Sequence, residues 1–443
     1  MDKIKKFNYI KVKNVIIFVL LGIWILIPVL KEMRFTSFFT NLNEYNYMQI
    51  LAIIGIYLIV YEFYKKFKTC KNKKELLKEL LPIAILLMYL MWTLVSAIFA
   101  KNKNLAFYGT SYRKDGFITY LIYAGFFACA FLMDSKRLRK YLLNIFILVA
   151  CLTIIFIEMA NNGHLYNIFD FNNIDTGVFS NSNHYGYYLL LVLLTSFLLF
   201  ITEKTKVNKG LYLISYIFIL YYFIKNNTFG CYIAFTVTAI IYFIYSIYIK
   251  KNITSSVIGL IIFVIMSFVV QIDGQSLVSK NVIVLFNDIS KILNINLDNK
   301  EELNEDNSNW EKAGSGRAVL WKYGIQFFLE KPIIGYGPEN LEQEYARFDI
   351  NQDRPHNLLI QLATTSGIIG MLSYCTAIGI IIIKGIRCFS RKDSVQKLVL
   401  FAVVAYLISA MFGNSMYYTS PYFFIFLGWL MKDNIGDKIY KLE

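Results

Sequence analysis

Two residues next to apolar segments have side chains suited to chemistry. His356 lies in the sequence DRPHN, directly before a long apolar run, and is one of three histidines in the chain. An imidazole titrates near neutral pH, so it can accept or donate a proton. Arg317 lies in the run GSGRAVLWKYGIQFF. A guanidinium stays charged in any environment and binds phosphate oxygens through paired hydrogen bonds. Together these residue types suit proton transfer beside a bound anion.

Both residues also have structural interpretations. A histidine at the edge of an apolar segment can simply form interfacial hydrogen bonds, and Arg317 can be a surface arginine that pairs with a nearby acid. The pattern around Arg317 nevertheless indicates a folded unit. Ser315 can cap a helix, apolar residues then recur at helical spacing, and Lys331-Pro332 would end that helix. Two glycines and a proline follow, and they predict a turn before a second short helix over roughly 338–347.

The elements that position these residues must lie in a membrane. Of the 443 residues, 57% are hydrophobic and 17% are charged, whereas soluble domains have about 45–50% apolar and about 25% charged residues. An aromatic content of 17% also excludes a disordered chain. Twelve apolar stretches are candidates for membrane spans. They are residues 14–30, 47–64, 80–100, 117–133, 141–160, 185–201, 211–224, 231–249, 254–272, 357–383, 397–412 and 421–431. The predicted fold class is therefore an all-α polytopic membrane protein.

The basic residues predict the orientation. Alternate loops together contain 29 Lys and Arg on one side and 16 on the other, and nine of those 16 lie in the long segment 273–356. Short cytoplasmic loops are rich in Lys and Arg, so this asymmetry explains the net charge of +15 without nucleic acid. We expect a cell-membrane protein with both termini in the cytoplasm. Its external loop, 273–356, divides into a mobile part (287–313) and a folded part (314–356), between the membrane regions 1–272 and 357–443.

The motifs around the two candidate residues resemble those of a known family. The runs GSGRAVLWKYGIQFFLEKPIIGYGPENL and RPHNLLIQLATTSGIIGMLSY are similar to the O-antigen ligase and polymerase family. Two upstream runs, YGTSYRKDGFITYL (108–121) and VFSNSNHYGYYLLL (178–191), are similar to external segments of that family. The resemblance covers roughly residues 105–380. It implies a fold like that of polyprenyl-dependent glycosyltransferases, with a large external loop that contains short amphipathic helices.

The resemblance also implies a reaction. The family transfers glycans from lipid carriers on the outer face of the membrane, so the implied donor is a glycan on undecaprenyl diphosphate and the acceptor is a glycan hydroxyl. Arg317 would bind the diphosphate. His356 would act as the base, or would orient the acceptor or bind the diphosphate as a cation. Many members carry a further arginine where this chain has Phe229. Either Lys225 or Arg113 takes over that charge, or the substrate is held differently.

Other external residues are candidates for substrate binding. Arg113 and Lys114 could complete a cationic clamp, or belong to a solvated basic loop. Asn181, Asn183 and His184 could bind sugar hydroxyls, or cap the next span. Tyr336 could stack on a sugar, or pack within the helical unit. The full set of predicted substrate-binding residues is Arg113, Lys114, Lys225, Asn181, Asn183, His184, Tyr336 and Asn357.

Three functions remain open from the sequence. The preferred one is a surface-polysaccharide polymerase of the cell envelope. The second is a ligase that moves a finished glycan to a lipid, wall or protein acceptor. The third is a polysaccharide transporter or lipid flippase, which the scarcity of charged residues within the spans disfavours. No cofactor and no metal-ligand set is expected, and the six cysteines form no CxxC pair. The expected partners are the lipid-linked donor, the glycan acceptor, membrane lipid and polysaccharide-assembly proteins.

Overall fold

The computed structural model describes residues 2–32, 43–162, 176–179, 181–292, 314, 316–389, 392–414 and 416–441. Each of the twelve predicted stretches overlaps a helix of its own. These helices are α1 (Asp2–Glu32), α3 (Glu44–Thr69), α4 (Lys73–Ile98), α6 (Phe117–Leu132), α7 (Lys136–Asn161), α8 (Ser182–Thr202), α9 (Lys206–Lys225), α10 (Phe229–Tyr248), α11 (Ile253–Val269), α15 (Leu358–Arg387), α16 (Ser394–Ala410) and α17 (Ser420–Lys441). Within the described ranges, eight helices are long and apolar enough to cross a membrane. The all-α polytopic membrane fold is thus confirmed.

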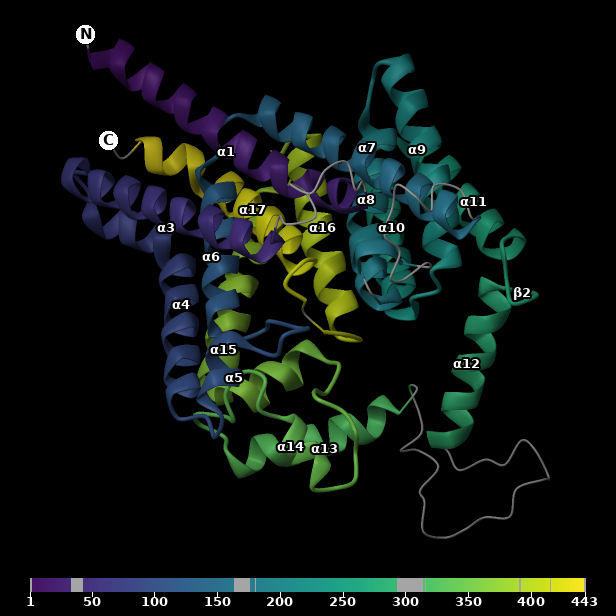
Figure 1. Cartoon of the computed structure of the whole chain (residues 1–443). Coiled ribbons are helices and arrows are strands. Elements are labelled where there is room, and N and C mark those ends of the chain that lie inside the picture. Colours follow the sequence, from purple (N-terminus) through teal and green to yellow (C-terminus); the bar gives the residue numbers. More distant parts are fainter. Residues whose placement is uncertain are drawn as a thin grey trace.

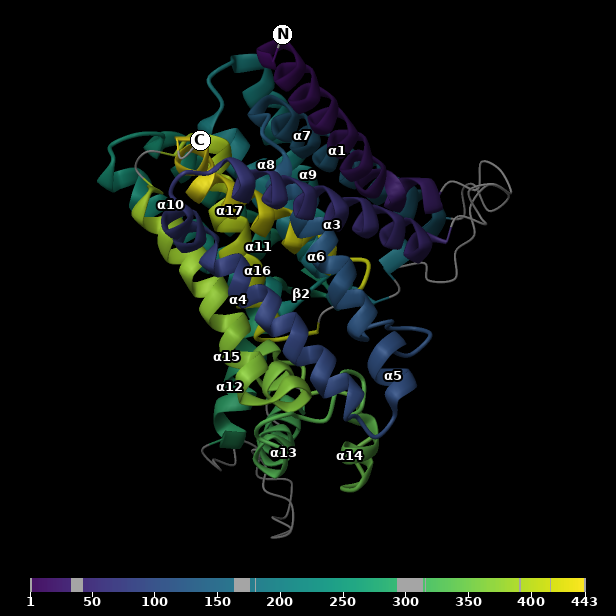
Figure 2. The same ribbon diagram turned by 90° about the vertical axis from the view of Figure 1, so that its left-hand side faces the viewer.

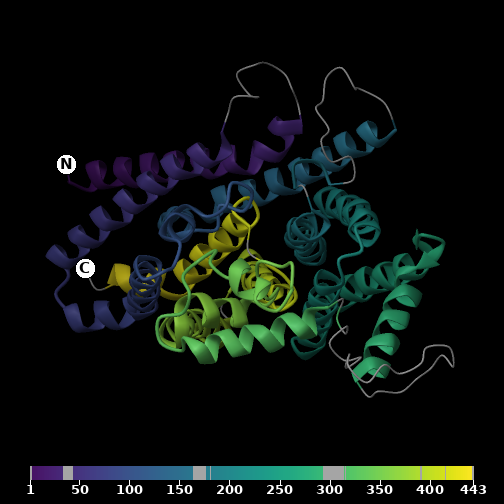
Figure 3. The same ribbon diagram turned by 60° about the horizontal axis from the view of Figure 1, so that its bottom comes forward.

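Shorter elements connect these helices. They are α5 (Lys103–Tyr108), the 3₁₀ turn η1 (Gly177–Phe179), α12 (Leu277–Ile292), α13 (Arg317–Glu330), α14 (Glu342–Ala346) and the antiparallel pair β1 (Gln271–Ile272) and β2 (Gln275–Ser276). Figures 1 and 2 show both chain termini at one end of the bundle and α5, α13 and α14 at the other. Figure 3 brings the α13 end forward.

The segment 273–356 differs in detail from its prediction. The sequence did not predict α12, whose last residues, 287–292, fall in the stretch predicted to be mobile. The rest of that stretch, 293–313, lies outside the described residues, as does the predicted cap Ser315. Helix α13 begins after Gly316, which has a φ of 80°, and ends before Lys331-Pro332 as predicted. The second helix, α14, has five residues and is shorter than expected.

A break in α15 anchors the α13 unit to the bundle. Gly367 has a φ of 62°, and the turn that follows α13 inserts at this point. The Tyr336 and Gly337 amides donate to the Thr364 and Thr365 carbonyls at 2.8 and 2.9 Å, and the Ile368 amide donates to the Pro332 carbonyl at 2.7 Å. A side chain on Gly367 would overlap the Ile333 carbonyl, so only glycine fits the break.

The same turn is also held by α4. Trp92 Nε1 donates to the Ile333 carbonyl at 3.1 Å, and Ser96 Oγ donates to the Ile334 carbonyl at 2.5 Å. The turn is therefore bonded to two helices far apart in sequence. These bonds satisfy two carbonyls of the inserted turn, as a membrane environment requires. The α13 unit is consequently a fixed part of the fold.

Candidate functional site

A buried arginine organises the end of the bundle that carries α13. Arg354 is 1% exposed, and its guanidinium contacts three carboxylates. Nη1 lies 3.2 Å from Asp115, Nε lies 3.2 Å from Asp353, and Nη2 contacts Glu339. Burial opposes its charge, but Glu339 and the other carboxylates outweigh burial and raise the pKa of Arg354 above its usual value. The cluster ties the loop before α6 to the segment between α14 and α15.

Arg113 joins this cluster through Asp353. Both side-chain oxygens of Asp353 contact the Arg113 guanidinium, one of them at 3.1 Å from Nη2. Burial would raise the pKa of Asp353, but the Arg354 and Arg113 charges outweigh burial and hold that pKa below its usual range. The charge of Arg113 is thus compensated in this state. It can join a cationic clamp only by sharing or releasing Asp353.

His356 is fixed by the turn between α16 and α17. Asn414 Nδ2 lies 2.9 Å from His356 Nδ1. With the amide nitrogen donating, Nδ1 accepts, and Nε2 carries the proton of the neutral ring. If the Asn414 amide is rotated by 180°, its oxygen instead accepts a hydrogen bond from Nδ1–H, and Nε2 is left unprotonated as a base. The Asn414 amide thus determines which role the imidazole can take.

The electrostatic surroundings keep His356 neutral. Burial lowers its pKa most, the Arg317 charge lowers it next, and Asp353 partly opposes both, so that the pKa falls to about 4. The charge of Arg317 therefore acts on the His356 ring, and a shared cavity for the two residues stays a prediction. At neutral pH the ring is therefore uncharged. A neutral ring suits proton transfer or hydrogen bonding better than it suits binding an anion as a cation.

Arg317 differs from the other arginines at this end of the bundle. It is partly buried at the first residue of α13, and within the described part of the chain its guanidinium has no hydrogen bond or carboxylate partner. Arg113, Arg347 and Arg354 all contact carboxylates. An uncompensated guanidinium at a helix N-terminus favours an anion. Arg317 therefore provides an open cationic position whose charge acts on His356.

Backbone strain gathers in the same place. Lys114, Glu339 and His356 have φ values of 48°, 55° and 52°. Such conformations cost non-glycine residues about 1–3 kcal/mol each and persist where surrounding contacts impose them.

Lys114 Nζ lies over the rings of Tyr45 and Tyr417, 4.8 and 5.1 Å from their centroids. The predicted Lys114 cation is thus already held by two aromatic rings.

Two of the predicted asparagines, Asn181 and Asn357, form helix caps in this structure. The Asn181 side chain accepts from the Asn183 amide at 2.8 Å and caps α8. Asn357 Oδ1 accepts from the Leu359 and Ile360 amides at the start of α15, while its Nδ2 donates to the Met411 carbonyl at 3.1 Å. The capping alternative for Asn181 is what the structure has. Their binding of sugar stays a prediction.

His184 and Tyr336 are buried among other side chains. His184 is 4% exposed, and its Nδ1 donates to the Tyr418 hydroxyl at 2.8 Å, because Tyr418 donates its own proton to the Phe179 carbonyl. Tyr336 is 5% exposed and donates to Glu330 at 2.7 Å. Lys331 Nζ lies 4.1 Å from its ring centroid. Packing, the alternative interpretation of Tyr336, is what the structure has.

Lys225 lies in a separate cavity of about 400 Å³. It is exposed at the end of α9, and its Nζ lies 5.2 Å from the Tyr221 ring centroid. Glu158, Ser182 and Asp273 also line this cavity. Nothing brings Lys225 into contact with His356 or Arg317, so its proposed replacement of the arginine at Phe229 stays a prediction.

Two adjoining cavities lead away from the Arg354 cluster. The first, of about 40 Å³, is lined by tyrosines together with Arg354, Gln361 and Asn414. The second, of about 230 Å³, lies among α3, α4, α6, α15 and α17 and is lined almost entirely by apolar atoms. Tyr89, Tyr120, Tyr374 and Phe424 line both. An apolar groove thus adjoins the polar site through a ring of aromatic side chains.

Sequence reasoning missed four residues of this site: Asp115, Glu339, Arg354 and Asn414. The first three lie inside runs that carry the family resemblance (YRKDG, GPEN and RPHN). The motifs therefore already contained these residues. Their charges suggested solvated loop residues, because pairing across 239 residues is not visible locally. In the described ranges, no three His, Cys, Asp or Glu side chains are grouped as metal ligands.

Comparison with known proteins tests the family resemblance. A search of curated proteins finds no match to the chain. Residues 190–375 match the sequence model of the O-antigen ligase family. That range includes Arg317, the Arg354 segment and His356, whereas Arg113 and Lys114 precede it. The match confirms the family predicted from the motifs: residues 190–375 of this integral membrane protein are an O-antigen ligase family segment.

Proposed function

We propose that this protein transfers a glycan from undecaprenyl diphosphate to the hydroxyl of an acceptor glycan, as a surface-polysaccharide polymerase. The observation that carries the proposal is the open cation of Arg317, whose charge acts on neutral His356, in the segment that matches the family. The remaining arginines of the site are engaged with carboxylates. The polar end of the site therefore has one free anion position and one adjacent proton acceptor.

In this proposal Arg317 binds the diphosphate of the donor. The sugar–oxygen bond to the diphosphate breaks, and negative charge grows on the leaving oxygens. The Arg317 guanidinium, at the first residue of α13, stabilises that charge together with the positive end of the helix dipole. Removing one such donor typically costs roughly 3–4 kcal/mol of transition-state stabilisation. The diphosphate leaves with both bonding electrons, so no further energy source is required.

With the Asn414 amide turned so that its oxygen accepts from the Nδ1–H group, His356 Nε2 is unprotonated and accepts the proton of the attacking hydroxyl while the new sugar–oxygen bond forms. Its pKa of about 4 makes it a weak base in the empty site. A bound diphosphate adds negative charge beside Arg317, which offsets the main charge that lowers this pKa. Donor binding thus raises the basicity of His356. A base of this kind contributes about 10²–10⁴-fold to the rate.

The aromatic-rimmed apolar groove accommodates the polyprenyl chain of the donor. It extends among the spans from residues that line the same cavity as Arg354, so a lipid chain can lie there while its diphosphate reaches the polar end. The loop charges favour placing this end outside the cell, with both termini in the cytoplasm. The two termini lie at the opposite end of the bundle from α13 (Figure 1), which agrees with that orientation.

A ligase is the second candidate, because the motifs are shared by both activities. Purified protein in liposomes, supplied with lipid-linked repeat units from its own cells, distinguishes them. A polymerase lengthens chains that remain on the lipid and releases undecaprenyl diphosphate. A ligase releases the same carrier only when a lipid, wall or protein acceptor is added. No released carrier under either condition would contradict both activities and favour the transporter interpretation.

A further inference from the structure

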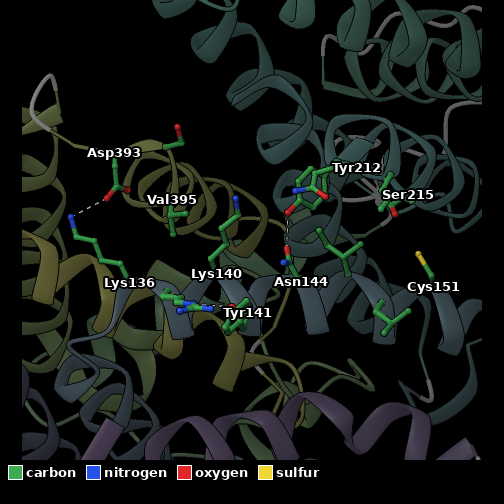
Figure 4. Close-up of a pocket in the computed structure, with 15 residues that line it drawn as sticks. Lys136, Lys140, Tyr141, Asn144, Cys151, Tyr212, Ser215, Asp393 and Val395 are labelled. Carbon is green, nitrogen blue, oxygen red and sulfur yellow. Dashed lines mark hydrogen bonds and ion pairs between the residues drawn. The ribbon is translucent and has the colours of Figure 1, made fainter. Parts of the chain in front are cut away.

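A further cavity lies far from the site. It has a volume of about 920 Å³ and opens between α7, α9 and α16 (Figure 4). Asp115 contacts Arg354 just before α6, and the 16 residues of α6 extend about 24 Å from there before α7 begins. The cavity is therefore at the opposite end of the bundle, the one where both chain termini lie. The proposed transfer reaction does not use it.

One face of α7 gives this cavity a gradient of polarity. Lys136 and Lys140 lie at its mouth, Asn144 follows one turn deeper, and Leu148 and Cys151 line the next turns. The spacing of three or four residues places these side chains on a single helix face. From Lys136 to Cys151 the face is about 22 Å long at 1.5 Å per residue. A leaflet has the same order, with charge at the surface and hydrocarbon below.

Helix α9 continues the same gradient on the opposite wall. Asn208 lies near its start, Tyr212 and Leu211 lie one turn on, and Ser215 lies deepest. Tyr212 donates to Asn144 at 2.8 Å, which aligns the depths of the two helices (Figure 4). Leu148 and Leu211 are each 58% exposed, so the deeper half of the cavity opens to the lipid-facing surface of the bundle.

The charges at the mouth favour an anion. Lys136, Arg137 and Lys140 line it, together with one carboxylate, Asp393. Asp393 is occupied, because it caps α16 and lies 2.9 Å from Lys136. Lys140 pairs with Glu203 at 2.8 Å. Within the described ranges, Arg137 contacts no carboxylate, and its Nε donates to the Tyr141 hydroxyl at 2.8 Å. The mouth therefore holds an exposed cation and an excess of positive charge.

We propose that this cavity binds an anionic glycerophospholipid. The phosphate lies at Arg137 with Lys136 beside it, the glycerol esters face Asn144 and Asn208, and one acyl chain follows Leu148 and Leu211. Basic pockets between membrane helices bind anionic headgroups in this manner. A soluble phosphate compound would leave the apolar half empty, and a zwitterionic lipid would gain less from the excess charge. The orientation proposed above places this lipid in the inner leaflet.

The test measures lipid binding directly. Delipidated protein in detergent is titrated with dioleoylphosphatidylglycerol or dioleoylphosphatidylcholine, and bound lipid is counted by native mass spectrometry. Wild-type protein should bind the anionic lipid more tightly. Each removed charge should weaken that binding about 5-fold, so Arg137→Gln costs about 5-fold and Arg137→Gln with Lys136→Gln about 30-fold. Leu211→Trp, which fills the apolar half from an exposed position, should also weaken binding.

Matched controls separate a site from general surface charge. Lys74→Gln removes an exposed cation at the start of α4, outside the cavity, and should leave binding unchanged. The proposal is overturned if both lipids bind equally, if Lys74→Gln weakens binding as much as Arg137→Gln, or if Leu211→Trp has no effect. Displacement of the lipid by millimolar inorganic phosphate would overturn it too, because it would indicate a site for soluble anions. Size-exclusion elution confirms that each variant is folded.

Discussion

Replacing Asn414 with aspartate is expected to raise the pKa of His356. The Asn414 amide lies 2.9 Å from Nδ1, and a carboxylate of similar shape would occupy the same position. It can only accept, so it would hold a proton on Nδ1 and leave Nε2 bare. The substitution therefore changes the charge next to the ring and the atom that carries the proton, while the side chain keeps its size.

The magnitude follows from the distance. An opposite charge within about 4–6 Å usually shifts a pKa by about 1–3 units. At 4 Å and an effective dielectric constant of about 20, the Coulomb energy is about 4 kcal/mol, so the shift should fall toward the upper part of that range. Starting from a pKa of about 4, the variant should titrate at roughly pH 6–7.

Histidine-selective ¹³C labelling in nanodiscs measures this pKa. The chain has three histidines, so three ring signals are expected, and a His356→Asn variant assigns the relevant one. Asn181→Asp is the matched control. It adds the same charge at the same end of the bundle, keeps a good helix cap, and has no contact with His356. The acid limb of the pH–activity profile should move upward with the pKa in Asn414→Asp alone.

Two results would refute this reasoning. One is a His356 pKa in Asn414→Asp within about half a unit of wild type, since the predicted shift is at least about one unit. That result would mean that Asn414 does not contact the ring. The other is an equal shift in Asn181→Asp, because it would mean that the field at this end of the bundle, and not the hydrogen bond, sets the pKa.

Three further substitutions have defined outcomes. Arg317→Ala should reduce glycan transfer by about 10²–10³-fold, whereas Arg347→Ala, an exposed arginine paired with two acids of the same unit, should change transfer less than about 2-fold. Arg354→Ala leaves buried carboxylates uncompensated and should cost about 3–5 kcal/mol, which is measurable as lost thermal stability in detergent. Gly367→Ala should lower the melting temperature more than Gly379→Ala, because the new methyl overlaps the Ile333 carbonyl in the first case and meets open space in the second.

Local pattern was enough to predict the spans. Apolar runs are continuous in sequence, and each of the twelve found a helix of its own. The helix after Gly316 was predictable for the same reason, from helical spacing and a closing proline. By contrast, α12 was not predicted, although its apolar residues recur at helical spacing, because it lies in a segment that resembled an external loop.

Partner choice could not be predicted from local pattern. Arg113 was a candidate for a cationic clamp or a solvated loop, but Asp353, 240 residues away, pairs with it. Asn414 reaches His356 across 58 residues from a turn without charge. Tyr336 was a candidate for stacking on sugar, yet Lys331 covers its ring. Sequence indicates which groups lie near the membrane boundary, whereas the fold decides which of them neutralise one another.

The most direct test of the central claim uses cells whose only copy carries His356→Ala. The length of each surface-polysaccharide chain, and the group to which it is attached, are measured with the protein present at its normal level. The proposed polymerase predicts single repeat units in place of long chains. Full-length chains stranded on lipid would indicate a ligase that uses the same residue. An unchanged profile would contradict the account, because it would remove His356 from the mechanism.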